Sequence, residues 1–314
     1  MATTTATKKS AGNKAKNGAA PTLNGSANGS AVTKKRLEVK KTYKIYIDGK
    51  FPRTESGRIY ALKNEAGEVI ANVCRGSRKD LRDSVVSNRK AQEAWAKRSA
   101  YNRGQILYRI AETLEGRRAQ FADNLVKQGY TAAAAQKEID ASVDLLVYYA
   151  GWSDKYTQVF SSVNPVESSH FNFSYHEPVG IVNIIAEQNS GLLGIVSASI
   201  PLIVGGNTCT VIASEKYPLT AVDFAEVLNA SDVPGGIINI ITGYRKEFTG
   251  HASSHMDVNA IVYSDLSADD RKLVQTNAAL NVKRVIDFSK EPLLNPYRIL
   301  AAQEVKTTWH PIGS

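Results

Sequence analysis

The chain has 314 residues, of which 43% are hydrophobic and 8% aromatic, so it can bury a substantial core. Its net charge is +9 at pH 7, but residues 1–41 hold nine Lys and Arg against one Glu, which leaves +1 for the remainder. This near-neutral remainder has no basic face of the kind that binds nucleic acid. The sequence contains no run of 18 apolar residues, so we expect no membrane-spanning helix. It also has no apolar stretch near its start, so we expect no secretory signal.

The two cysteines, Cys74 and Cys209, show no metal-site spacing and do not suggest a disulfide framework. We therefore expect a protein of the reducing cytoplasm.

Residues 1–41 are mostly Ala, Thr, Ser, Asn, Gly and Lys, and they cannot bury enough apolar surface to offset the entropy of ordering. We predict a disordered basic tail. It is interpreted either as a solubility device or as an arm that docks onto an acidic partner, acidic surface or nucleic acid. A transit peptide is disfavoured because Arg is nearly absent.

From Tyr43 onward the pattern changes to one of ordered structure. Alternation around Asp48-Gly49 predicts a β-hairpin, and a second strand is expected near 68–73. Apolar residues at helical spacing then predict four helices. Their expected ranges are 79–97, 102–115, 119–127 and 133–156.

The second half of the chain begins with an amphipathic strand, in which Phe171, Phe173 and Tyr175 alternate with polar residues. Apolar, β-branched runs joined by helices follow Pro178, and they predict an α/β fold with a doubly wound parallel sheet. The expected strands are 180–185, 208–213, 236–241, 260–263 and 282–286, with helices near 200–206 and 221–236.

Two motifs, PVGIVNIIAEQNSGLL from Pro178 and IPLIVGGNTCTVIASEKYPLTA from Ile200, resemble the coenzyme-binding half of the aldehyde dehydrogenase family. The final segment, ILAAQEVKTTWHPIGS, resembles that family's C-terminal oligomerisation strand. The resemblance implies a Rossmann-like coenzyme-binding-type domain at 42–290 with an oligomerisation arm at 157–177. It also implies an oligomerisation strand within 291–314. Because the two parts are nearly contiguous here, we expect the family's catalytic domain to be missing.

The resemblance also implies which catalytic groups are lost. Asn189 falls on the family's oxyanion-hole asparagine, but Phe288 falls on the general-base glutamate and Asp287 is one residue away. The nucleophilic cysteine would lie in the missing part, and Cys209 and Cys74 are interpreted as packing thiols. We expect no catalytic residue, with Asn189 a vestige.

The resemblance implies a damaged coenzyme site as well. Glu215 falls on the ribose-binding glutamate, while Thr242 and Gly243 remain from the glycine-rich loop. The departures from the family pattern are Ile212, Arg245, Thr249, Asp265, Leu266 and Asp270. Carboxylates such as Asp265 are expected to repel a pyrophosphate. We expect no cofactor, with NAD(P) binding as the alternative.

His251 and His255 are four residues apart, but no third ligand is evident, so a solvated helix face is favoured over a metal site.

These patterns lead to a first hypothesis of a non-catalytic aldehyde dehydrogenase-like subunit that acts in assembly with itself or with full-length aldehyde dehydrogenase subunits. The alternatives are an NAD(P)-dependent oxidoreductase of this family that is active only with a partner, and a scaffold protein tethered by its basic tail. Retained strand edges are expected to form the subunit interface. The expected interface residues are Phe171, Phe173, Tyr175, Val305, Thr307 and Trp309.

Overall fold

The computed structural model describes residues 39–313, so the predicted tail falls almost entirely outside the described residues. A five-stranded parallel sheet of order β10-β9-β6-β7-β8 forms its centre. The strands are β6 (Ile181–Ile185), β7 (Thr208–Ile212), β8 (Ile238–Ile241), β9 (Ala260–Tyr263) and β10 (Arg284–Asp287). Every residue of β6, β7, β8 and β9 is buried, as expected where helices cover both faces of a sheet. The prediction of a doubly wound parallel sheet is confirmed.

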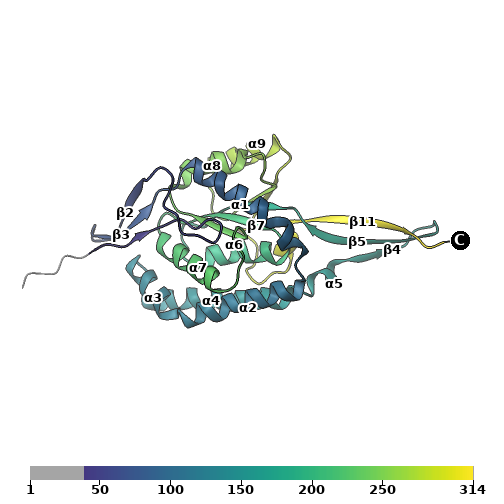
Figure 1. Ribbon diagram of the computed structural model, residues 1–314, viewed down its shortest axis with the longest axis horizontal. Helices are drawn as coiled ribbons and strands as arrows, with labels where there is room; N and C mark the ends of the chain where they lie inside the picture. The colour runs from purple at the N-terminus through teal and green to yellow at the C-terminus, as the bar shows by residue number, and fades with distance from the viewer. Residues whose placement is uncertain (1–38, 314) are drawn as a thin grey trace, which may run out of the picture. The chain divides into compact units, whose positions relative to one another are not determined.

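Helices cover both faces of this sheet (Figure 1). One face carries α1 (Arg78–Lys97) and α8 (Arg245–Ser254), and α9 (Ala268–Ala279) packs on α8. The opposite face carries α6 (Leu193–Val204) and α7 (Pro218–Ala230). Three further helices pack on α6 and α7 as an outer layer, and they are α2 (Ala100–Gly116), α3 (Arg118–Lys127) and α4 (Ala132–Trp152).

Several helix starts follow from capping residues that the sequence displays. Ser77 and Asp80 form a reciprocal capping box at the start of α1. The side chains of Ser99 and Thr131 accept from backbone N–H groups at the starts of α2 and α4. The predicted helix 133–156 is wrong at its end, because α4 stops at Trp152 and a separate helix, α5 (Tyr156–Phe160), follows.

The predicted hairpin near the start is only partly correct. Asp48 and Gly49 both have positive φ (55° and 71°), and Ile47 and Lys50 exchange backbone hydrogen bonds of 3.0 Å around this turn. Tyr46 bonds instead to Ile240 of β8, with two N–H···O distances of 2.8 Å. The order of the small sheet beside this turn is β1-β3-β2, with β1 (Thr42–Tyr43), β3 (Val69–Cys74) and β2 (Ile59–Lys63).

A second three-stranded sheet, which we call the arm, projects from the helical body (Figure 1). Its order is β11-β5-β4, with β11 (Gln303–Pro311), β5 (His170–Pro178) and β4 (Ser162–Asn164). The short helix α10 (Tyr297–Leu300) leads into β11, which pairs antiparallel with the whole of β5. The strand predicted around Phe171, Phe173 and Tyr175 and the strand predicted within 291–314 are therefore both present, as β5 and β11, and they are direct neighbours.

No helix within residues 39–313 is long and apolar enough to cross a membrane.

Candidate functional site

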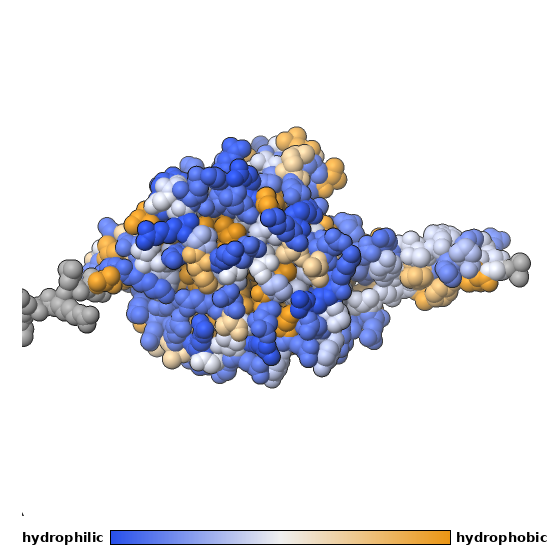
Figure 2. All heavy atoms as spheres, viewed as in Figure 1, coloured by the Kyte–Doolittle hydropathy of each residue, from blue (hydrophilic) through white to orange (hydrophobic). Residues whose placement is uncertain are grey.

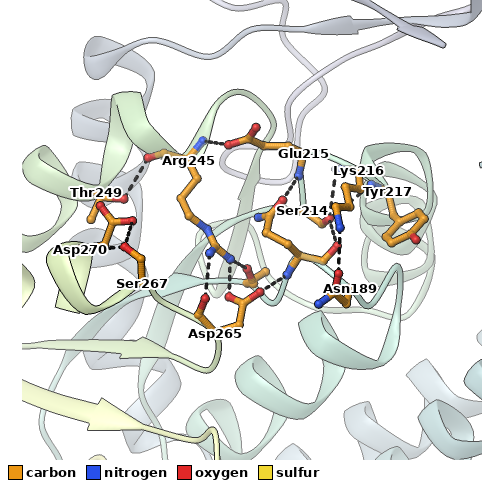
Figure 3. Close-up of polar contacts among 12 residues, drawn as sticks. Asn189, Ser214, Glu215, Lys216, Tyr217, Arg245, Thr249, Asp265, Ser267 and Asp270 are labelled. Atoms are coloured by element: carbon orange, nitrogen blue, oxygen red, sulfur yellow. Dashed lines mark hydrogen bonds and ion pairs between the residues drawn. The ribbon is translucent and has the colours of Figure 1, made fainter. Parts of the chain in front are cut away.

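The sheet has one point where its strand order reverses, and this point locates the candidate site. From β6 the chain proceeds outward through β7 and β8, and then crosses to β9 and β10 on the other side of β6. In open α/β sheets, ligands bind in the crevice beyond the carboxyl ends of the strands at such a reversal. The loops after β7 and β9 and the start of α8 bring Glu215, Asp265 and Arg245 to this edge of the sheet (Figure 3). Gln188, in the loop after β6, bonds to Asp265 and Glu215 there, and we call the position of these four residues the crevice.

The Arg245 side chain lies at this reversal point. Its Nη2 atom is 2.5 Å from Asp265 Oδ1 and 2.6 Å from the carbonyl oxygen of Ala186, and Nη1 donates to the Asp265 carbonyl at 3.3 Å. The Arg245 side chain is only 12% exposed and that of Asp265 22% exposed. Ala186 directly follows β6, and Asp265 lies two residues after β9. The guanidinium group therefore bridges the two strands between which a ligand would be expected to sit.

Two further residues complete a closed circuit of hydrogen bonds with this pair (Figure 3). The backbone N–H of Gln188 donates to Asp265 Oδ2 at 2.6 Å, and Gln188 Oε1 accepts from the backbone N–H of Glu215 at 2.9 Å. The Glu215 carboxylate in turn accepts from the backbone N–H of Arg245. Each member of the circuit is held by its neighbours, so no single side chain can leave without breaking at least one bond.

Helix N-termini beside this crevice would normally offer free N–H groups to an anion. The start of α8 is occupied by the Glu215 carboxylate. At α9, the hydroxyl of Ser267 accepts from the backbone N–H of Asp270 and donates to its carboxylate. At each of these two helix starts, one backbone N–H group is therefore already bonded to a side chain of the protein itself.

The start of α6 is closed by a residue that sequence reasoning missed. Glu138 of α4 accepts through Oε1 from the hydroxyl of Ser190 at 2.6 Å and from the backbone N–H groups of Leu192 and Leu193 at 2.9 and 3.0 Å. Glu138 is more than fifty residues from these partners, and no local pattern connects them.

Burial and the nearby Asp265 carboxylate raise the pKa of Glu187, which lies in the loop between β6 and α6.

Thr242 and Gly243, predicted as vestigial cofactor-binding residues, contact the segment between β3 and α1. The Thr242 hydroxyl donates to the carbonyl of Cys74 at 2.7 Å, and the Thr242 carbonyl accepts from Gly76 N at 2.8 Å. Gly243 has a φ of +150°, and an added Cβ would lie 2.8 Å from the ring of Phe248. In this chain both residues have packing roles that require no ligand.

Asn189, the predicted oxyanion vestige, is exposed, and its Oδ1 accepts from Lys216 Nζ at 2.9 Å. Phe288, which falls on the base position, is 4% exposed, and the guanidinium of Arg298 lies 4.3 Å from its ring centre. Asp287 faces Arg271 at 3.7 Å and accepts from a backbone N–H two residues further on. The residue predicted to stand at the base position is therefore an aromatic ring in the core.

The structure corrects the electrostatic expectation for Asp265. Its carboxylate is paired with Arg245, so its charge is compensated within the protein. Asp269 and Asp270 lie in the first turn of α9, where acidic residues favour the helix dipole. A phosphate would therefore meet an occupied crevice, not a bare negative charge at Asp265.

The remaining titratable candidates do not converge on this crevice. Cys209 and Cys74 are both buried, and burial raises the pKa of the Cys209 thiol. His251 lies in the last turn of α8, and His255 is the residue that caps this helix. Among residues 39–313 no group of three or more metal-ligating side chains occurs.

A family model described as the aldehyde dehydrogenase family matches residues 51–286. The chain belongs to the aldehyde dehydrogenase family. It is 31% identical over 258 residues to a "Putative aldehyde dehydrogenase DhaS" of Bacillus subtilis, covering 80% of this chain and 51% of that protein. It is 30% identical over 255 residues to "Omega-crystallin" of Enteroctopus dofleini, with the same coverage of 80% and 51%.

Solved structures of this family have the same fold. The NAD+ complex of aldehyde dehydrogenase from Bacillus cereus superposes with a TM-score of 0.74 at 25% identity, over 78% of this chain and 50% of that one. The chain thus spans about half the length of the aldehyde dehydrogenase family relatives that it matches.

Proposed function

We propose that this chain is a non-catalytic subunit of the aldehyde dehydrogenase family that acts in oligomer assembly or in the regulation of full-length subunits. The observation that carries the proposal is the Arg245–Asp265 pair in the crevice at the reversal of strand order. A protein of this kind keeps the family's scaffold and uses the ligand crevice for its own packing. The cytoplasm, as expected from the cysteine content, is the proposed compartment.

The residues present do not fit a dinucleotide in this crevice. A bound pyrophosphate needs free backbone N–H groups at a helix start and close approach to the backbone. Here Glu215 holds the N–H at the start of α8, and the Arg245 side chain covers the ends of β6 and β9. To admit the cofactor, the protein would have to break a largely buried ion pair, which commonly costs several kcal/mol.

The arm supports the assembly part of the proposal. Members of this family are usually oligomers. The outer edge of β11 pairs with no strand among residues 39–313, and Val305 and Trp309 on this strand are 63% and 57% exposed. A long open edge with exposed apolar side chains favours pairing with another chain.

The two predicted sets of interface residues lie on opposite faces of the arm. Register places Phe173 opposite Thr308 and Tyr175 opposite Lys306, whereas Trp309 lies opposite Asn172. Directly opposed residues project to the same side, and successive residues alternate. Phe171, Phe173 and Tyr175 therefore form one ladder, with ring centres 5.6 and 6.1 Å apart, and Val305, Thr307 and Trp309 line the other face. Apolar side chains are visible along the arm in Figure 2.

Sedimentation velocity tests the assembly role. Wild-type protein is expected to form a dimer or a larger species, and the double variant Val305→Lys/Trp309→Lys is expected to sediment as a monomer. The matched control, Val126→Lys/Val147→Lys, places two lysines at helix positions that are 45% and 44% exposed and is expected to remain assembled. A monomeric wild type at all concentrations, mixed with or without a full-length aldehyde dehydrogenase, contradicts the proposal.

An NAD(P)-dependent oxidoreductase completed by a partner is the second candidate, favoured by membership in the family. Calorimetric titration with NAD and NADP separates the two. Our proposal predicts no heat and no thermal shift at millimolar cofactor. Saturable binding at micromolar concentration would establish the second candidate instead.

A further inference from the structure

A groove of about 590 Å³ lies between the first turn of α1 and the C-terminal end of α8, and we call it the α1–α8 groove. The crevice described above is at the opposite, N-terminal end of α8. A ten-residue helix is about 15 Å long, so the two places are separate sites. The volume of the groove is within the range of small-molecule sites.

The α1 wall of this groove is cationic. Arg78, Lys79 and Arg82 line it, and no carboxylate does. Lys79 forms an ion pair with Glu55 at 2.8 Å, and Arg82 pairs with its neighbour Asp83. Within residues 39–313 the Arg78 guanidinium forms no ion pair or hydrogen bond. This concentration of positive charge occurs on a body whose net charge, outside residues 1–41, is only +1.

The two arginines are arranged to act together. Arg78 and Arg82 are four residues apart on one helix, so their side chains leave the same face of α1. Arginine offers a planar set of donors that matches a phosphoryl group, and two neighbouring arginines can bind one such group.

The α8 wall also presents donors. The ring of His255 accepts at Nδ1 from the backbone N–H of Asp257 at 3.3 Å, so the neutral ring carries its proton on Nε2. The carbonyl of His255, the residue directly after α8, and that of Val258 accept from Lys283 Nζ at 2.8 and 2.7 Å, so this amine lies beside the negative end of the helix. An ammonium group therefore compensates the helix end that would otherwise repel an anion. His251 contributes a second imidazole to this wall.

Apolar surface completes the groove. Leu81 is buried, whereas Met256 is 75% exposed, which is unusual for a large thioether side chain. We propose that the α1–α8 groove binds a small organic phosphate, with its phosphoryl group between Arg78 and Arg82 and its apolar body against Met256. The inference is independent of the proposed assembly role, because the groove shares no residue with the arm or the crevice.

A single methyl group reports on this site. The chain has two methionines, Met1 and Met256, so a sample labelled with methyl-¹³C methionine gives one resonance that belongs to the groove. Phenyl phosphate is the probe, with benzyl alcohol as the uncharged analogue and inorganic phosphate as the analogue without an apolar body. We expect a saturable shift of the Met256 methyl with phenyl phosphate, a weaker effect with inorganic phosphate and none with benzyl alcohol.

Charge-matched variants decide whether the arginines are responsible. Arg78→Gln/Arg82→Gln should weaken phenyl phosphate binding by about 10-fold or more, because both charge-assisted donors are lost. Lys127→Gln/Lys272→Gln removes the same charge elsewhere and should leave the affinity within about twofold. Absence of a Met256 shift up to about 10 mM phenyl phosphate, or equal weakening in both double variants, would overturn the proposal.

Discussion

The Arg245–Asp265 pair should contribute much more to the free energy of unfolding than an exposed ion pair with the same N···O distance. Its side chains are 12% and 22% exposed, and its N···O distance is 2.5 Å. With charge centres about 4 Å apart and an effective dielectric constant near 20, the Coulomb attraction is about 4 kcal/mol before desolvation. We expect a net coupling energy of about 2 kcal/mol after desolvation, and a loss of about 3 kcal/mol for the single substitution Arg245→Met, which leaves Asp265 uncompensated.

A double-mutant cycle measures this coupling directly. Urea denaturation, followed by circular dichroism, gives the free energy of unfolding for wild type, Arg245→Met, Asp265→Asn and the double variant. The control cycle uses Lys97 and Glu93, whose N···O distance is also 2.5 Å but whose side chains are 75% and 76% exposed. That pair should give a much smaller coupling, because solvent screens both of its charges. If the Arg245–Asp265 coupling is no larger than the control, the pair does not hold the crevice closed.

Three further substitutions test buried polar groups. Glu138→Gln weakens the contacts to Leu192 N and Leu193 N and should lower the free energy of unfolding by about 1–3 kcal/mol in thermal melts; an unchanged midpoint contradicts the capping role. Burial raises the pKa of Asp223 to about 6, so the native state keeps this proton at pH values where the unfolded chain has lost it, and stability falls as pH rises from about 4 to 6. The substitution Asp223→Asn should therefore raise the free energy of unfolding by up to about 3 kcal/mol at pH 7.5 and by little at pH 4. Equal effects at the two pH values would refute this. Burial lowers the pKa of Lys283 to about 8, so between pH 8 and 10.5 the unfolded chain keeps a proton that the native state has released. The free energy of unfolding should therefore rise with pH over this range more steeply in wild type than in Lys283→Met. Parallel curves of unfolding free energy against pH would argue against this.

The order and type of the elements were predictable from the sequence. The runs of apolar, β-branched residues that form β6 to β9 require burial on both faces of the sheet. The helical spacing of apolar residues in 79–97 and 102–115 matches α1 and α2 closely. The alternation of Phe171, Phe173 and Tyr175 predicted a strand, and β5 contains all three on one face. Local periodicity is sufficient here because it reports directly on which side of an element is buried.

The pairing of distant segments was not predictable in the same way. The Asp48-Gly49 turn was found from its residues, but Tyr46 pairs with β8, nearly two hundred residues away, and not with the other side of the turn. A local pattern specifies a backbone conformation and leaves the choice of partner open, because that choice depends on which free strand edge the fold brings nearby.

The state of the crevice depended entirely on the tertiary structure. The sequence identified Arg245 and Asp265 as departures from the family pattern, and it suggested that Asp265 would repel a pyrophosphate. Only the fold brings the ends of β6, β7, β8 and β9 to one edge, where the two charges meet and Glu215 and Gln188 complete the circuit. The sequence by itself singled out Glu215, Arg245 and Asp265, and the tertiary structure decided that they bind one another, because opposite charges brought together in a largely buried place are stable only as a pair.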